Sequence, residues 1–133
     1  MDNHSCVKIL NEWDIVSARQ LGRNIARELH FGAVDQARIT TAISELARNI
    51  FIYAGQGEIR IEKVLQNGKK GLKVIAIDKG PGIENIRKVM EDGYSTSGGL
   101  GAGLPGVRRL MDEFDIVSAP NEGTTVTAIK WIR

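Results

Sequence analysis

The spacing of apolar residues changes at Gly55, and this change constrains the fold more than any other feature of the chain. Before Gly55, apolar residues recur with the helical period of 3.6 residues, which predicts helices over about 14–32 and 35–54. After Gly55 they alternate with a period of 2, which predicts strands over 57–65 and 72–77. Because helices come early and strands mostly later, we expect a two-layer α/β sandwich, with a mostly antiparallel sheet and helices on one face.

Turn signals complete the layout. Asn67 and Gly68 form a tight-turn signal, so the two strands around them should pair as an antiparallel hairpin. Asp14 is the predicted N-cap of the first helix. No repeat or linker divides the 133 residues, so we expect a single domain over 1–133. The remaining expected elements are a strand over 6–10, a short helix near 84–90, a helix from about 104, and a strand pair over 114–119 and 124–132.

Charge and composition exclude several classes of protein. The 18 basic and 16 acidic residues give a net charge of +2 without a basic block, which argues against nucleic-acid binding. No window reaches the ~18 apolar residues that a membrane span requires, and no secretory leader is visible. Cys6 cannot form an internal disulfide, and a buried strand cysteine is its expected state. His4, His30 and Cys6 are too few for a nitrogen and sulfur metal site. We therefore expect a cytoplasmic protein that binds neither nucleic acid nor membrane.

Glycine is overrepresented in one region. Of the 15 glycines, eight lie between Gly80 and Gly106, and the run 98–103 opens directly into a predicted helix. Free amides at a helix N-terminus, together with the helix dipole, form a phosphate site, although the run could also be a hinge without a ligand. The stretch 101–106 reads G-x-G-x-x-G, but a dinucleotide fingerprint must follow a strand, and this one follows loop residues.

Two further places could carry chemistry. Glu45 and Asn49 lie one turn apart at the margin of the second helix's apolar stripe, where a carboxylate beside an amide oxygen suits a hard cation and a polarised hydroxyl. The alternative is an exposed glutamate with an asparagine at the stripe's edge. Asp78 shares its strand face with Val74 and Ala76, so it should point between the layers, where it could accept a hydrogen bond from a ligand amine or cap its own turn. The glycines that follow it allow a tight bend and the approach of a ring.

Three boxes follow in order: Glu-x-x-x-Asn on a helix, Asp-x-Gly-x-Gly after a strand, and a glycine-rich run before a helix. With these boxes the chain resembles the GHKL ATP-binding family, which has the Bergerat fold. Its short length resembles the bacterial switch-protein and anti-sigma serine kinases of that family. The resemblance implies a protein serine/threonine kinase that uses Mg²⁺ and ATP to phosphorylate STAS-domain antagonist proteins in a stress-response partner-switching pathway. It also implies binding and activation of a PPM-type serine phosphatase.

The resemblance also assigns residues by position. It implies that Glu45 is the general base or hydroxyl-orienting group, that Asn49 binds Mg²⁺, and that Asp78 accepts a hydrogen bond from the adenine amine. The other implied nucleotide-binding residues are Gly80 and Gly82 near the base, Gly99, Gly101 and Gly103 at the phosphates, and Thr125 near the adenine end.

Two other functions and one surface remain open. The chain could be an anti-sigma factor that sequesters a sigma factor, with kinase activity secondary, although anti-sigma relatives usually carry histidine where Tyr53 stands. It could also be a nucleotide-gated binding module that acts by contact. Arg19, Arg23 and Arg27 form a basic stripe on the first helix, which is either a solvated face or a docking surface.

Overall fold

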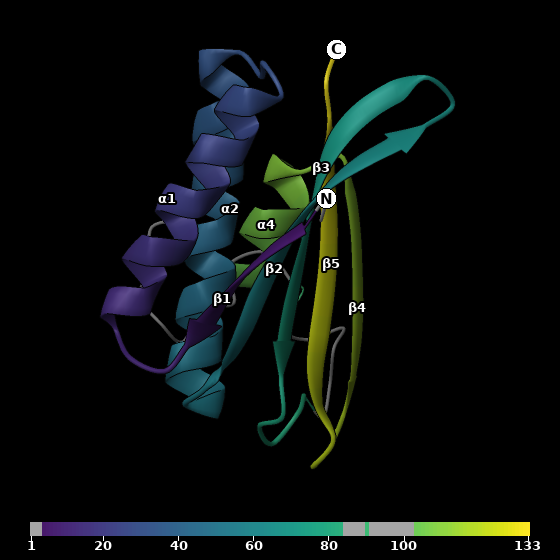
Figure 1. Cartoon of the computed structure of the whole chain (residues 1–133). Coiled ribbons are helices and arrows are strands. Elements are labelled where there is room, and N and C mark those ends of the chain that lie inside the picture. Colours follow the sequence, from purple (N-terminus) through teal and green to yellow (C-terminus); the bar gives the residue numbers. More distant parts are fainter. Residues whose placement is uncertain (1–3, 84–89, 91–102) are drawn as a thin grey trace.

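A five-stranded sheet carries a layer of helices on one face in the computed structural model (Figure 1), which describes residues 4–83, 90 and 103–133. The elements are, in chain order, β1 (His4–Ile9), α1 (Trp13–Glu28), α2 (Ala33–Asn49), the π-helix η1 (Ile50–Ala54), β2 (Gly57–Gln66), β3 (Lys69–Asp78), α4 (Gly103–Leu110), β4 (Glu113–Ala119) and β5 (Gly123–Trp131). The predicted two-layer α/β sandwich is confirmed. Apart from Met90, the helix expected near 84–90 lies outside the described residues.

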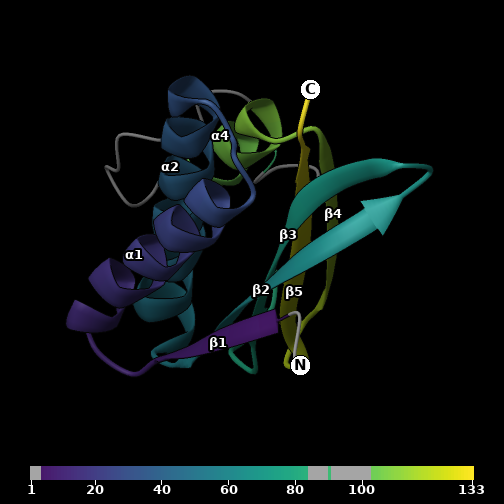
Figure 2. The ribbon, with the colours of Figure 1, turned by 45° about the horizontal axis from the view of Figure 1, so that its top comes forward.

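The sheet is antiparallel throughout. Its strand order is β1-β2-β3-β5-β4, and all four neighbouring pairs run antiparallel. The predicted β2–β3 hairpin is confirmed, and its turn places Asn67 (φ 52°) and Gly68 (φ 79°) in the left-handed conformation that a two-residue hairpin loop favours. Seen from two directions, the tip of this hairpin extends beyond the neighbouring strands (Figures 1 and 2).

The first helix begins differently from the prediction. Its N-cap is Glu12, which makes no side-chain capping bond, so the prediction that Asp14 is the N-cap is wrong. Asp14 lies within the first turn, where its Oδ2 accepts hydrogen bonds from the backbone N–H groups of Leu10 (2.8 Å) and Asn11 (3.1 Å). The carboxylate thus satisfies donors of the turn before the helix rather than the helix's own free amides.

The second helix is the centre of the helical layer. α2 packs against both α1 and α4, and it lies between them in Figure 2. Contact on two flanks and on the sheet side buries a wide sector of α2, so seven of its residues are buried, Glu45 among them. A Cβ on Gly22 of α1 would collide with the Ile43 side chain of α2, so this glycine lets the two helices approach closely. No helix in the described part of the chain is long and apolar enough to cross a membrane.

A buried lysine connects the end of α4 to the sheet. Lys130 of β5 is 5% exposed, and its Nζ donates a hydrogen bond to the Leu110 carbonyl (2.9 Å) at the C-terminal end of α4. The same ammonium lies 3.4 Å from Asp112 Oδ1 and 3.8 Å from Asp35 Oδ1, so its charge is compensated by two carboxylates. Asp112 also accepts hydrogen bonds from Trp131 N (2.8 Å) and Arg133 Nη2 (2.5 Å).

These contacts make the stability of the fold depend on pH. Burial alone would raise the pKa of Asp112, but the hydrogen bonds from Trp131 and Arg133 and the Lys130 charge hold this pKa below its ordinary value. A depressed folded-state pKa adds stability above the unfolded pKa, near 4, and this stability is lost as the pH falls through the folded value. We expect Asp112→Asn to lower the free energy of unfolding by about 2 kcal/mol at neutral pH.

The difference between wild type and Asp112→Asn should shrink toward pH 3, because the wild-type carboxyl is then being protonated. Urea unfolding at several pH values measures it. A pH-independent difference would mean that the Asp112 charge adds nothing to stability.

Candidate functional site

Asp78 ends the central strand β3 on the side that faces the helices. It shares that face with the buried Val74 and Ala76, as predicted. Its Oδ1 accepts a hydrogen bond from the backbone N–H of Gly80 (2.9 Å), so one oxygen caps the turn that follows the strand. Among the described residues none donates to Oδ2, and the side chain is only half-buried. The carboxylate can therefore cap its turn and still accept a hydrogen bond from a ligand.

Two glycines that the sequence did not single out allow the strands on both sides of Asp78 to approach its backbone closely. Gly57 of β2 is its register partner, and a Cβ there would collide with the Ile77 carbonyl and lie 3.1 Å from the Asp78 Cβ. Gly123 opens β5 with a φ of 84°, and a Cβ there would collide with the Asp78 carbonyl. Each is the first residue of its strand, where a glycine signals a close backbone approach.

The two glycines after Asp78 are required by contacts within the protein. A Cβ on Gly80 would lie 2.6 Å from the Ala54 Cβ in η1, and a Cβ on Gly82 (φ 78°) would collide with the Ala119 carbonyl at the end of β4. The turn is thus held against η1 on one side and against the β4–β5 turn on the other. The expected approach of a ligand ring to Gly80 and Gly82 stays a prediction, and their close packing gives the turn a fixed position.

Glu45 and Asn49 lie on the last two turns of α2. Glu45 is 3% exposed, and its Oε1 lies 3.7 Å from Arg48 Nη1. The alternative of an exposed glutamate is therefore wrong. Asn49, the last residue of α2, is half-buried. The chain continues as η1, which ends on the bond from Gly55 N to the Ile50 carbonyl (2.9 Å), and π-helical turns often occur at functional sites. Because the last residue of η1 packs against Gly80, the end of α2 continues into a segment that lies against the Asp78 turn.

The donor set suits Mg²⁺ only when a ligand supplies most of the coordination. The described residues hold no group of three or more His, Cys, Asp or Glu side chains that could form a cage around a metal. Mg²⁺ commonly binds to one or two protein oxygens, substrate phosphates and waters. The half-buried amide of Asn49 at a helix end fits such a site, in which the protein contributes a single oxygen.

The structure does not bring Thr125 to this site. Thr125 pairs with Ile77 and Val117, so it lies on the face of the sheet opposite to Asp78. Thr124 is the register partner of Asp78 and shares its face, and its Oγ1 lies 2.8 Å from Ser118 Oγ. Because successive side chains of a strand lie on opposite faces, the register places Thr124, and not Thr125, on the face of Asp78. The role of Thr125 near the adenine end stays a prediction, and its position on the opposite face argues against it.

The glycine-rich run is described only at its end. Gly103, with a φ of 66°, is the first residue of α4, so the predicted helix start is confirmed. Pro105 lies in the first turn, where its missing N–H costs no helical hydrogen bond. A Cβ on Gly103 would meet nothing closer than Pro105 Cδ at 4.0 Å. Gly99 and Gly101 lie outside the described residues.

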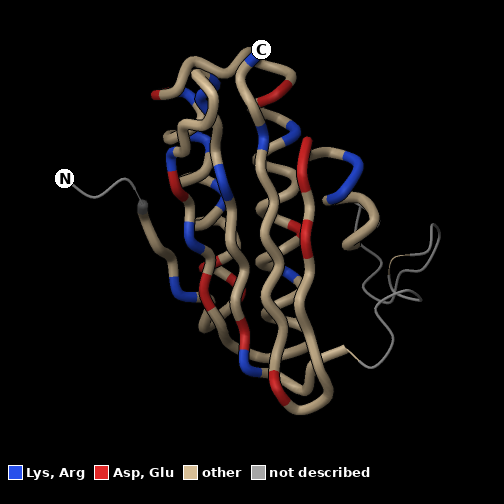
Figure 3. Tube along the Cα trace, turned by 90° about the vertical axis from the view of Figure 1, so that its right-hand side faces the viewer, with Lys and Arg blue, Asp and Glu red and all other residues tan. Residues whose placement is uncertain are grey.

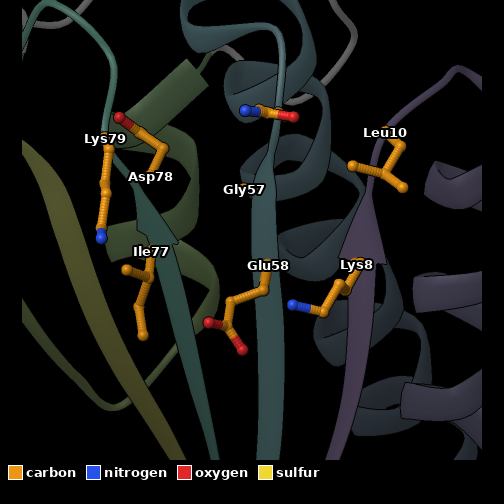
Figure 4. Close-up of a pocket in the computed structure, with 8 residues that line it drawn as sticks. Lys8, Leu10, Gly57, Glu58, Ile77, Asp78 and Lys79 are labelled. Carbon is orange, nitrogen blue, oxygen red and sulfur yellow. The ribbon is translucent and has the colours of Figure 1, made fainter.

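A hollow of about 320 Å³ lies at the strand ends (Figure 4). Its lining residues are Lys8, Leu10, Gln56, Gly57, Glu58, Ile77, Asp78 and Lys79.

Glu58 accepts hydrogen bonds from the Cys6 thiol (2.9 Å) and Arg60 Nε (3.2 Å), and these contacts lower the pKa of the Glu58 carboxyl. Cys6 is exposed, so its predicted burial is wrong, and desolvation together with Glu58 raises the pKa of its thiol. Both signs of charge are interspersed along the strands (Figure 3).

Comparisons with known proteins agree on one family. The family profile described as histidine kinase-, DNA gyrase B- and HSP90-like ATPase matches residues 34–132. Over all 133 residues of both chains, the sequence is 72% identical to the serine/threonine-protein kinase RsbT of Bacillus subtilis (strain 168). It is 32% identical over 120 residues to the anti-sigma F factor of Thermoanaerobacter sp. (strain X514), covering 86% of this chain and 83% of that one.

Solved structures have the same fold at low sequence identity. The RsbU and RsbW domains of Rv1364c from Mycobacterium tuberculosis align with a TM-score of 0.65 and 21% identity, over 96% of this chain and 31% of that one. This chain therefore spans about a third of that neighbour. The mycobacterial sensor histidine kinase MprB aligns with a TM-score of 0.57 and 15% identity over 98% of both chains.

Proposed function

The chain belongs to the family of histidine kinase-, DNA gyrase B- and HSP90-like ATPases and is an ATP-dependent protein serine/threonine kinase, and we propose that it phosphorylates STAS-domain antagonist proteins. The identity of 72% to a serine/threonine-protein kinase along the whole chain supports this assignment. We further propose that residues 1–133 act as one kinase domain in the cytoplasm.

The observation that carries the proposal is the position of Asp78. Its carboxylate ends the central strand, faces the helices, and keeps one oxygen available after capping its own turn. This oxygen can accept a hydrogen bond from the exocyclic amine of adenine. Such a hydrogen bond stabilises a half-buried carboxylate, because burial without a partner is unfavourable. In the proposal Thr124, on the same face, lies near the base, and Gly80 and Gly82 hold the turn beside it.

The proposed transfer chemistry uses the end of α2. Glu45 would accept the proton of the substrate hydroxyl or orient that hydroxyl toward the γ-phosphate, because its buried carboxylate lies one turn from Asn49. Asn49 would hold Mg²⁺, which neutralises phosphate charge during phosphoryl transfer. Gly99, Gly101 and Gly103 would present backbone N–H groups to the phosphates, and Gly103 starts a helix whose N-terminus favours anions.

We place the kinase in a bacterial stress-response partner-switching pathway, in which it also binds and activates a PPM-type serine phosphatase. The second candidate is an anti-sigma factor, and the 32% identity to anti-sigma F factors favours it specifically. The two differ in their main output, which is phosphate transfer in one case and sequestration of a sigma factor in the other.

Phosphate transfer from labelled ATP to purified STAS-domain proteins tests the proposal. We expect wild type to label a STAS protein on serine or threonine in the presence of Mg²⁺, and EDTA to abolish the labelling. The same preparation should bind sigma factors weakly. Tight binding of a sigma factor without transfer to any STAS protein would support the anti-sigma function.

A further inference from the structure

Ser118 of β4 joins three parts of the chain through one hydroxyl group. Its Oγ accepts a hydrogen bond from the backbone N–H of Ile83 (2.9 Å) and donates one to the Gly123 carbonyl (3.0 Å). The Thr124 hydroxyl of β5 lies 2.8 Å from the same oxygen. Ser118 therefore connects the turn after β3 to the adjoining ends of β4 and β5.

These three contacts determine which group donates each hydrogen bond. An amide N–H only donates and a carbonyl only accepts, so the single proton of the Ser118 hydroxyl is directed to Gly123. The bond between the two hydroxyl groups must then be donated by Thr124. Within the described part of the chain this is the one hydrogen bond of the Thr124 side chain. Its Oγ1 thus keeps lone pairs for a ligand but has no proton left to donate.

Asp78, Thr124 and Ser118 form a row across three neighbouring strands. Thr124 is the register partner of Asp78 on one side and of Ser118 on the other. Directly paired residues project from the same face, with Cβ atoms about 5 Å apart. The Asp78 oxygen that does not cap the turn and the Thr124 Oγ1 are therefore neighbouring groups that accept hydrogen bonds and donate none.

Ser118 also holds the turn that Asp78 caps. The hydrogen bond from Ile83 attaches the end of this turn to β4, and a second bond, from the Asn121 N–H to the Pro81 carbonyl (2.6 Å), attaches it to the β4–β5 turn. Of these two bonds, only the first depends on a side chain. A substitution of Ser118 therefore changes both the orientation of the Thr124 hydroxyl and the attachment of the turn.

We propose that Ser118 is a positioning residue for recognition of the nucleobase: it fixes the Thr124 hydroxyl as an acceptor beside Asp78, so that this end of the sheet selects a base with an exocyclic amine. This inference rests on the proposed function, which supplies the adenine nucleotide. An exocyclic amine has two N–H groups, one for each acceptor. A base without the amine leaves both acceptors unpaired, and a site built to bind a donor rejects analogues that lack it for this reason.

The test compares ATP with purine riboside 5′-triphosphate, which lacks only the amine. Titration calorimetry with Mg²⁺ present gives the affinity of each protein for both nucleotides, and the ratio of the two dissociation constants is the amine preference. Ser118→Ala removes the hydroxyl, and Ser118→Thr keeps a hydroxyl at the same position. Ser44→Ala is the matched control, because Ser44 is half-buried and donates one hydrogen bond to the Thr40 carbonyl (2.9 Å) within α2.

We expect wild type to prefer ATP at least about thirtyfold. Ser118→Ala should bind ATP about tenfold more weakly but purine riboside 5′-triphosphate within about threefold of wild type, so its amine preference falls. Ser118→Thr and Ser44→Ala should keep the wild-type preference. A general loosening of the fold would weaken both nucleotides equally, so it would leave the preference unchanged.

Thr124→Val provides a second measurement if Ser118→Ala folds poorly. It removes the acceptor and leaves Ser118 bonded to Ile83 and Gly123, and it should lower the amine preference as well. Thermal unfolding checks the fold of every variant.

A wild-type preference in Ser118→Ala or in Thr124→Val would overturn the inference, and so would an equal loss of preference in Ser44→Ala. If wild type binds both nucleotides equally, or neither, recognition of adenine at Asp78 fails, and the proposed nucleotide site fails with it. That result differs from one in which wild type prefers ATP and the variants match it.

Discussion

Replacing Asp78 with asparagine is expected to reduce ATP affinity at least about a hundredfold, the largest effect on binding of any single change in the proposed site. The asparagine Oδ1 can still accept the Gly80 N–H bond, so the turn after β3 should keep its geometry. The second position becomes an N–H donor that faces the adenine amine, so a hydrogen bond is replaced by two opposed donors. A loss of about 3 kcal/mol or more corresponds to this fold-change.

Titration calorimetry with ATP and a non-hydrolysable analogue measures this effect. The matched control is Asp115→Asn, the same chemical change on an exposed residue of β4, which should leave affinity unchanged. If Asp78→Asn binds ATP within threefold of wild type and unfolds at the same temperature, Asp78 serves only as a turn cap.

Replacing Glu45 with glutamine should separate binding from transfer. The amide preserves the volume of a buried side chain, so no cavity forms, but it cannot accept a proton. A positioned general base typically contributes 10²- to 10⁴-fold to a rate, so we expect transfer to slow by about that factor while ATP affinity stays within threefold. Glu45→Ala should slow transfer similarly and also destabilise the fold.

Single-turnover transfer to a STAS protein at saturating ATP measures the chemical step directly. Glu12→Gln is the matched control, because Glu12 is exposed and makes no capping hydrogen bond. Transfer by Glu45→Gln at the wild-type rate would exclude Glu45 as base or orienting group. Equal losses of ATP affinity and of transfer rate would instead indicate that Glu45 acts by maintaining the conformation at the end of α2.

The periodicity of apolar residues predicted the helices, strands and strand faces well, because these features depend on local sequence patterns. The turn at Asn67 and Gly68 needs only the left-handed preference of those two residues, and both have positive φ in the structure. The face of Asp78 follows from strict alternation along β3, and the buried Val74 and Ala76 confirm it. Such features require no knowledge of distant parts of the chain.

The sequence did not predict the features that depend on contacts between residues far apart in the chain. The burial of Glu45 could not be derived from the stripe of α2, because α2 is also covered by elements far away in the chain, among them α4, which lies more than 50 residues later. The π-helical form of 50–54 has no simple periodic signature, and the sequence predicted an ordinary helix there. The close packing of Gly57 and Gly123 around Asp78 became visible only once the register of three strands was known.

The strand order has a consequence for how the protein is made. β5 is the last strand in chain order, yet it lies inside the sheet, between β3 and β4. A growing chain can pair β1, β2 and β3 early, but β3 then exposes an open edge until residues 123–131 leave the ribosome and insert beside it. Gly123 and Thr124 join Asp78 only at that step. A nascent chain therefore completes the walls of its proposed nucleotide site last, and it passes through a stage in which an unpaired strand edge needs protection from aggregation.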